Sequence, residues 1–72
     1  MSEAGEGHTQ RAVIQAPWGR EVTVTEIVYE GGMRALRLRI RENKRFTDLE
    51  LDPDTAKRLA EVLTGWAEAA GK

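Results

Sequence analysis

The residues best suited to bind a ligand form a short basic segment, here called the basic strip: Arg34, Arg37, Arg39, Arg41, Lys44 and Arg45. Three of these arginines occupy alternate positions in residues 37–41. Alternate residues of a strand share one face and lie about 6 to 7 Å apart, close to the spacing of successive phosphates in an unpaired nucleic-acid strand. Phosphate binding is therefore the first chemistry that the sequence suggests.

Aromatic residues could add base stacking to the basic strip, because unpaired bases stack on aromatic rings. Phe46 follows the strip and is expected on its face, beside Arg41. An aromatic ring in that position can stack a base or can be buried against a second copy of the chain. Trp18 lies in a Pro-Trp-Gly turn, where it either anchors a partner or covers one end of a sheet. Trp66 falls on an apolar helix stripe, so we expect it in the core.

Acidic residues near the strip support a competing interpretation. Asp48 and Glu50 alternate in the next segment, and a tight hairpin would place them opposite Arg39 and Arg37. The sheet itself would then neutralise these two arginines. The sequence leaves both interpretations open: a strip that is free to meet phosphates, or a charge ladder that is only structural.

The chain has a poor inventory for catalysis or metal binding. It contains no cysteine and one histidine, His8, and its one serine is Ser2. Asp52 and Asp54 suit the start of a helix and need no metal to explain them. A nucleophile with an adjacent base cannot be assembled from these residues, so we expect no enzyme, no metal site and no cofactor.

Length and composition limit the possible organisation. A domain of 72 residues buries only about 60% of the surface that its unfolded chain exposes, so a monomer would be marginally stable and a homodimer is expected. Residues 34–45 carry a net charge of +5 within a chain of net charge −1, which leaves −6 for the rest. This asymmetry either marks a surface for an anionic partner or is cancelled inside the fold.

The same composition bears on location. The absence of cysteine is compatible with a reducing compartment, and we expect a cytoplasmic protein with no membrane association. Residues 1–10 are polar and lack an apolar leader, and the apolar runs elsewhere are too short for a membrane span. The organisation predicted is a disordered tail over residues 1–10 and a single domain over residues 11–72.

The basic strip belongs to a predicted β-hairpin. Residues 36–41 and 46–52 both alternate apolar with charged side chains, and the charges have opposite signs in the two segments. A two-residue turn at Asn43-Lys44 fixes the register. That register pairs these apolar side chains: Leu38 with Leu49 and Leu36 with Leu51.

Two further strands precede the hairpin. Residues 11–16 alternate up to the Pro-Trp-Gly turn, and residues 21–30 are rich in β-branched side chains. The alternation in the second segment changes phase beyond Glu26, which predicts a bulge or a strong bend near Glu26. Gly31-Gly32 predicts the turn that leads into the hairpin, because such turns need positive φ.

A helix is predicted over residues 53–70. Asp52 is suited to the N-cap, Pro53 to the first helical position and Gly71 to the C-terminal stop. Gly65 inside the helix predicts the close approach of another backbone. Apolar residues at helical spacing form one stripe, here called the helix stripe: Ala56, Leu59, Ala60, Leu63, Trp66, Ala67 and Ala70.

The predicted fold class is α+β: a four-stranded antiparallel meander in the order 1-2-3-4, followed by one C-terminal amphipathic helix. The helix stripe is expected to cover the sheet face that carries the apolar hairpin residues: Leu36, Leu38, Ile40, Leu49 and Leu51. Val62 and Ala69 lie beside the stripe and widen the apolar surface, which favours a homodimer.

This arrangement resembles the positive cofactor four family of single-stranded-DNA-binding transcriptional coactivators. The resemblance covers about residues 21–66 and is carried by Val22-Thr-Val-Thr, Gly31-Gly32, residues 36–42 and residues 44–63. It implies a dimer formed through the helices, with curved sheets that grip unpaired strands. The contact residues that it implies are Arg37, Arg39, Arg41, Lys44, Arg45 and Phe46.

Two functional hypotheses follow from the sequence. The first is a small noncatalytic module that binds single-stranded nucleic acid through the basic strip. The second is a protein-interaction or accessory domain, in which the charges are structural and Trp18 or a dimer surface holds the partner. The hypotheses separate on whether Asp48 and Glu50 lie within hydrogen-bonding reach of the arginines opposite them.

Overall fold

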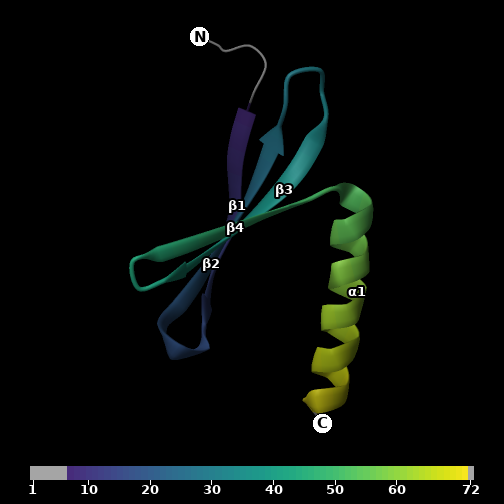
Figure 1. Cartoon of the computed structure of the whole chain (residues 1–72). Coiled ribbons are helices and arrows are strands. Elements are labelled where there is room, and N and C mark those ends of the chain that lie inside the picture. Colours follow the sequence, from purple (N-terminus) through teal and green to yellow (C-terminus); the bar gives the residue numbers. More distant parts are fainter. Residues whose placement is uncertain (1–6, 72) are drawn as a thin grey trace.

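The protein is a four-stranded sheet followed by one helix, seen in a computed structural model that describes residues 7–71 (Figure 1). The strands form one antiparallel sheet in the order β1-β2-β3-β4, which confirms the predicted α+β class and the meander. The elements have these bounds: β1 Gly7–Ala16, a short turn Pro17–Gly19, β2 Arg20–Val28, β3 Arg34–Glu42, β4 Arg45–Leu51 and α1 Pro53–Ala70.

The β3–β4 hairpin has the register that its alternation predicts. Leu38 pairs with Leu49, and Arg39 pairs with Asp48. Asn43 begins the two-residue turn with φ of 59°, a left-handed conformation that asparagine adopts more readily than most residues. The predicted hairpin is therefore confirmed, including its turn.

The first strand is longer than predicted, and its irregularity lies in a different place. β1 begins at Gly7, so residues 7–10, which we expected in a disordered tail, pair with β2. The rest of the expected tail, residues 1–6, lies outside the described residues. The predicted bulge near Glu26 is wrong: β2 pairs with β3 without interruption, and the register instead shifts in β1, between Gln10 and Ala12.

The pairing of β1 with β2 explains this difference. An extra residue, Arg11, is inserted on β1, so the irregularity is absorbed by the edge strand and β2 stays regular between its two neighbours. The change of phase in the sequence of β2 therefore means that apolar side chains appear on the other face of the strand. Ile27, on the face opposite Glu26, is fully buried.

Cross-strand partners share a face, so the registers define two surfaces. The first is the apolar face: Ala12, Ile14, Val22, Val24, Leu36, Leu38, Ile40, Leu49 and Leu51. The second is the charged face: Glu21, Arg37, Arg39, Arg41, Phe46, Asp48 and Glu50.

The connection between β2 and β3 turns on two glycines. Gly31 and Gly32 have φ of 94° and 91°, as the predicted turn requires. The N–H of Gly32 donates to the carbonyl of Tyr29 at 2.9 Å, and the N–H of Tyr29 donates to the carbonyl of Met33 at 2.7 Å. These hydrogen bonds close the loop.

The helix α1 begins and ends where the sequence predicts. The side chain of Asp52 accepts a hydrogen bond from the N–H of Thr55 at 2.9 Å, and Pro53 occupies the first turn. Hydrogen bonds from Thr55 lower the pKa of the Asp52 carboxyl, and the bond from its side chain has a larger effect than the bond from its backbone. At the other end the N–H of Gly71 donates to the carbonyl of Ala67 at 2.9 Å.

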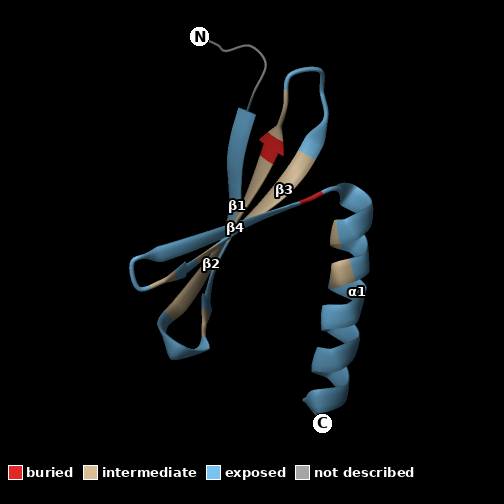
Figure 2. Cartoon of the chain, in the orientation of Figure 1, coloured by how far each residue is buried: buried red, intermediate tan, exposed pale blue. Residues whose placement is uncertain are grey.

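The helix stripe covers much less of the sheet than predicted. Ala56 and Leu59 are half-buried, but Leu63 is 58% exposed and Trp66 is 71% exposed (Figure 2). The expectation that Trp66 lies in the core is therefore wrong for this chain. The close approach expected at Gly65 does not occur within the chain, because a Cβ there would meet no atom within 4 Å. An approach by a second copy stays a prediction.

The fold is open. Ile27 and Leu51 are the buried hydrophobic residues among those described. The radius of gyration is 14.5 Å, against about 11 Å for a compact domain of this length. The accessible surface is 5812 Å², whereas a folded monomer of 8.1 kDa exposes about 4,500 Å².

Candidate functional site on the two faces of the sheet

On the charged face, Arg37 is held by the strand beside it. Its Nη2 donates to Oε2 of Glu50 at 2.8 Å and its Nε to the same oxygen at 3.2 Å. The other carboxylate oxygen, Oε1, accepts a hydrogen bond from the Tyr29 hydroxyl at 2.6 Å. The hydrogen bonds from Tyr29 and Arg37 lower the pKa of Glu50, and the donation to Glu50 raises the pKa of the Tyr29 hydroxyl.

Arg39 is held in the same way by Asp48. Its Nε donates to Oδ1 at 2.7 Å and its Nη2 to Oδ2 at 2.8 Å, a bidentate pair that uses both carboxylate oxygens. The hydrogen bond from Arg39 lowers the pKa of Asp48. The same guanidinium lies 5.7 Å from the ring centroid of Phe46, a cation–π distance.

The remaining arginines of the strip find partners on β2, which hairpin pairing alone does not predict. Arg41 lies 3.6 Å from Glu21, and Arg34 donates from Nε to Glu26 at 2.7 Å. The pairing of β3 with β4 alone gives neither of them a carboxylate partner. Within residues 7–71, Lys44 and Arg45 make no ion pair with a carboxylate.

Phe46 lies where the sequence places it, opposite Arg41 on the charged face, and it is 60% exposed. Of the residues predicted to contact nucleic acid, Arg37, Arg39, Arg41 and Phe46 therefore share the charged face, whereas Arg45 pairs with Glu42 on the opposite face and Lys44 lies in the turn. Most of their positive charge is neutralised there, because the two central arginines each have a carboxylate across the hairpin. Lys44 and Arg45 at the β3–β4 turn are the cations that stay available.

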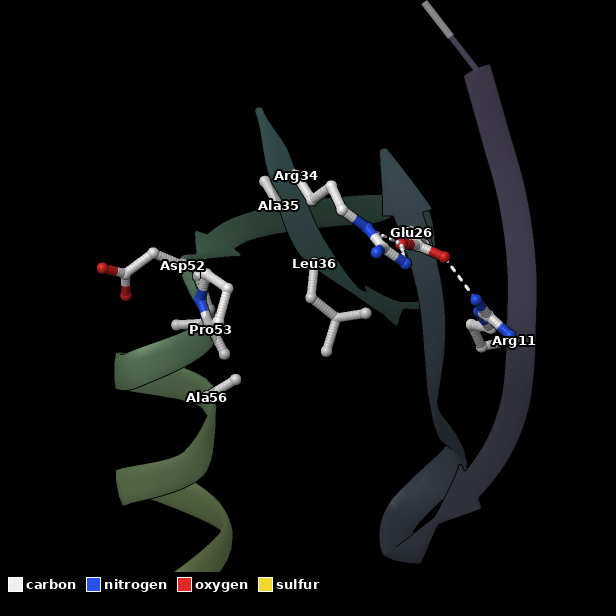
Figure 3. Close-up of a pocket in the computed structure, with 9 residues that line it drawn as sticks. Arg11, Glu26, Arg34, Ala35, Leu36, Asp52, Pro53 and Ala56 are labelled. Atoms are coloured by element: carbon white, nitrogen blue, oxygen red, sulfur yellow. Dashed lines mark hydrogen bonds and ion pairs between the residues drawn. The ribbon is translucent and has the colours of Figure 1, made fainter. Parts of the chain in front are cut away.

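A second ion cluster lies on the opposite face and was not foreseen. Glu26 accepts hydrogen bonds from Arg11 and from Arg34 (Figure 3). Both lower the pKa of the Glu26 carboxyl, and the bond from Arg11 has the larger effect. The Glu26 side chain is only 14% exposed. The bulge in β1 brings Arg11 to Glu26. The signal available in the sequence was Glu26 itself, an acid at alternate spacing between Val24 and Val28 in a strand. We interpreted it as a bulge and placed that bulge in the wrong strand.

A cavity of about 430 Å³ separates this ion cluster from the start of α1. Leu36 points into it, with Pro53 and Ala56 of the helix on one side and Glu26 on the other (Figure 3). The lining is mainly apolar, and its charged groups already have partners: Arg11 and Arg34 pair with Glu26, and Asp52 caps the helix. The cavity marks the place where the helix begins to leave the sheet.

Trp18 projects from the β1–β2 turn. It is 86% exposed, so it does not cover the sheet. Its φ of 62° is unusual for a bulky side chain, for which the left-handed region costs about 1 kcal/mol or more. Gly19, the next residue, has φ of 74° and tolerates the turn without this cost. An exposed tryptophan held in a strained turn is a candidate contact residue.

The apolar face is the largest surface that the fold leaves unsatisfied. Ile14 and Leu49 are about half exposed, and the facing part of α1 exposes Val62, Leu63 and Trp66. Soluble monomers rarely expose large contiguous apolar patches, and such patches usually mark an interface. We call the C-terminal part of the helix stripe, with Val62, the free stripe: Val62, Leu63, Trp66, Ala67 and Ala70.

Across residues 7–71, His, Asp and Glu side chains do not gather in groups of three or more that could hold a metal ion. The one helix described there, α1, is not apolar enough to cross a membrane.

Comparisons with known proteins place the chain in a family. No curated protein and no solved structure matches it. A family model described as "Family of unknown function (DUF6967)" matches residues 6–69, which is most of the chain. The resemblance to the positive cofactor four family therefore stays a prediction. By this match, the chain belongs to the DUF6967 family.

Proposed function

We propose that this domain is a noncatalytic protein-interaction module that binds through its apolar surfaces. One observation carries the proposal: the apolar face is only partly covered, with Ile14 and Leu49 about half exposed, and the free stripe is exposed in the same small chain. Burial of apolar surface is the main driving force of protein association. A partner that covers these surfaces would also supply the core that the chain lacks.

The pairing of the basic strip favours this proposal over nucleic-acid binding. A phosphate that approaches Arg37 or Arg39 meets a guanidinium whose charge is already paired with Glu50 or Asp48, and both carboxylates repel the phosphate from the same face. Nucleic-acid affinity depends on cations that neutralise phosphates. Arginines already neutralised within the sheet contribute little to it.

Trp18 is proposed as a second contact of the interaction module. Tryptophan is among the residues that most often dominate binding at interfaces, because it buries a large surface and carries one N–H donor. Its exposure and its strained φ support a role outside the fold, since nothing in the sheet requires a bulky side chain there.

Binding of single-stranded nucleic acid is kept as a second candidate on one observation. Phe46 is exposed beside Arg39, and Lys44 and Arg45 come just before it, at the turn. An aromatic ring with nearby cations is the arrangement that stacks an unpaired base. The patch is small, so this candidate predicts weak binding that depends on these residues.

Fluorescence anisotropy separates the two candidates. Labelled single-stranded and duplex oligonucleotides are titrated with the protein at low and at moderate salt. We expect no binding in the micromolar range and no change on replacing Phe46 by Ala or Lys44 and Arg45 by Gln. Salt-sensitive binding that prefers the single strand, and that these substitutions weaken, would contradict the proposal and favour the second candidate.

Affinity capture tests the interaction function directly. The wild-type chain is compared with Leu63→Glu, Trp18→Ala and a matched control, Thr64→Glu, which adds the same charge on the polar side of α1 next to Leu63. We expect a partner in fixed stoichiometry with the wild type and the control, and its loss with Leu63→Glu. Equal recovery by all four chains would argue against binding through these surfaces.

A further inference from the structure

We infer that the missing cover is a second copy of this chain, in a two-fold dimer where the free stripe of each copy packs on the apolar face of the other. This inference names the partner of the interaction surface and so rests on the proposed function. Four features of the chain support it: its own helix cannot close the face, the surface area fits a dimer, the two surfaces match, and symmetry joins them.

The chain cannot close its own apolar face because the link into the helix is too short. Leu51 is the last residue of β4, and Asp52 alone separates it from α1. Asp52 has an extended backbone, with φ of −81° and ψ of 169°, and its side chain caps the helix. The cap and the link fix where α1 starts and its direction.

From this start α1 diverges from the sheet. Its first turns, with Ala56 and Leu59, meet the sheet near Leu36, and the rest runs beside the sheet without covering it (Figure 1). Eighteen residues of helix extend about 27 Å, so most of the stripe lies beyond reach of the chain's own apolar face. The free stripe and the apolar face are thus two separate surfaces.

The excess exposed area of the chain is large enough for a dimer interface. The chain exposes about 1,300 Å² more than a folded monomer of its mass, since 5812 Å² is observed and about 4,500 Å² is expected. A specific protein interface of standard size buries about 800 Å² on each partner. The excess surface is therefore large enough to supply such an interface.

The two surfaces match in chemistry. Another side of α1 carries a shallow surface that is lined by four polar residues, Lys57, Glu61, Thr64 and Glu68, together with Ala60 and Gly65. On the apolar face the ion pairs lie away from the central residues, with Arg20–Glu42 at one end and the Glu26 cluster at the other. Packing stripe against face would bury no unpaired charge, which avoids the main cost of association.

Symmetry favours a second copy over an unrelated partner. In a two-fold dimer each chain offers the same surfaces to its partner, so a contact between stripe and face occurs twice. One symmetric association then covers all four exposed surfaces. An unrelated partner would have to complement a sheet face and a diverging helix separately.

Sedimentation equilibrium on the wild type and two variants tests the inference. We expect a species of twice the 8.1 kDa chain mass at micromolar concentration. Leu63→Glu should raise the dimer dissociation constant at least about 100-fold, because a carboxylate would be buried at the interface. Thr64→Glu should leave it within about threefold of the wild type, as expected for a residue outside the interface. A folded wild-type monomer, or equal effects of both variants, would overturn the inference.

A spin-label experiment keeps the inference testable if Leu63→Glu does not fold. Since the chain has no cysteine, Glu68→Cys provides one attachment site on the polar side of α1. Labelled chains without ¹⁵N are co-refolded with ¹⁵N wild type, so that any broadening arises between copies. We expect broadening of amides on the partner's apolar-face strands, around Leu38 and Leu49. Broadening limited to the partner's helix, or none, would overturn the proposed geometry.

The two proposals fail in different ways. Oligonucleotide binding through the strip by an intact dimer would contradict the interaction function and leave the dimer standing. A folded monomer that captures another protein through Leu63 would contradict the dimer and leave the interaction function standing. The binding experiments and the measurement of oligomeric state are separate, so the two failures can be told apart.

Discussion

The two faces of the sheet differ in whether the chain itself provides partners for their side chains. On the charged face, Arg37, Arg39 and Arg41 each have a carboxylate partner within the same chain, and the groups can remain in water. On the apolar face, Ile14 and Leu49 stay about half exposed because the helix that could cover them runs elsewhere. The charged face is complete in one copy of the chain, and the apolar face is not.

The difference has a physical origin. One side chain on the next strand is enough to satisfy a charged group, and alternation supplies that neighbour automatically. An apolar surface is satisfied only by another layer of structure, since a sheet buries its face by packing against a second element. The incomplete face is therefore where a partner is expected, although the charged face is more conspicuous in the sequence.

The largest effect should come from a charge placed on the apolar face. Val24→Asp puts a carboxylate between Ala12 and Leu38, and we expect it to cost about 3 kcal/mol or more of unfolding free energy if a partner covers the face. Urea denaturation followed by circular dichroism measures this cost.

The matched control for Val24→Asp is Thr23→Asp on the neighbouring position. Thr23 lies on the charged face opposite Arg39, so the added carboxylate meets a cation and should change stability by less than about 0.5 kcal/mol. Equal costs for the two substitutions would break the contrast between the faces.

An intermediate effect is expected at Glu26, the ion cluster at the end of the apolar face. Glu26→Gln removes the charge that holds both Arg11 and Arg34, and its side chain is largely shielded from water. We expect Tm to fall by roughly 5 °C. Glu30→Gln removes the same charge from an exposed position and should leave Tm nearly unchanged. A fall of similar size for both variants would mean that the cluster adds nothing specific.

Acid should weaken the ion pairs of both faces together. The pKa values of Glu26, Asp48 and Glu50 are lowered in the folded chain from ordinary values of 3.8 for aspartate and 4.5 for glutamate. Their contribution is therefore fully present above those ordinary values and is lost as pH falls through the lowered ones. Urea midpoints should be flat from pH 7 to about pH 5.5 and should drop below about pH 4. A marked loss already between pH 7 and pH 6 would assign the transition to other groups.

The smallest effect should come from the charged face. Arg39→Gln breaks the bidentate pair with Asp48, but about half of the Arg39 side chain is exposed, and solvent-exposed ion pairs contribute little to stability. We expect Tm to change by less than about 2 °C, similar to the change for Lys57→Gln on the exposed side of α1. A loss as large as that of Val24→Asp would reverse the proposed contrast.

Local pattern predicted the elements that depend on neighbours in sequence. The hairpin register followed from alternation on both sides of Asn43, and the helix start followed from Asp52 and Pro53. The turn at Gly31 followed from the need for positive φ. In each case the decisive interactions join residues within one hairpin or one helical turn, so the sequence contains them directly.

The partners of Arg34 and Arg41 could not be predicted in that way. Both pair with β2, whose register against β3 depends on contacts between the two strands. The sequence shows a break in alternation but does not say which strand absorbs it. We placed it at Glu26, and the edge strand absorbs it instead.

The sequence by itself determined the order of the elements, the β3–β4 register and the amphipathic character of both the sheet and the helix, because these depend on periodicity and capping. Tertiary structure alone decided that α1 leaves the sheet after Leu59 and that Trp66 lies outside the core. Periodicity says which side of an element is apolar, but the direction of the chain through a one-residue link decides what that side meets.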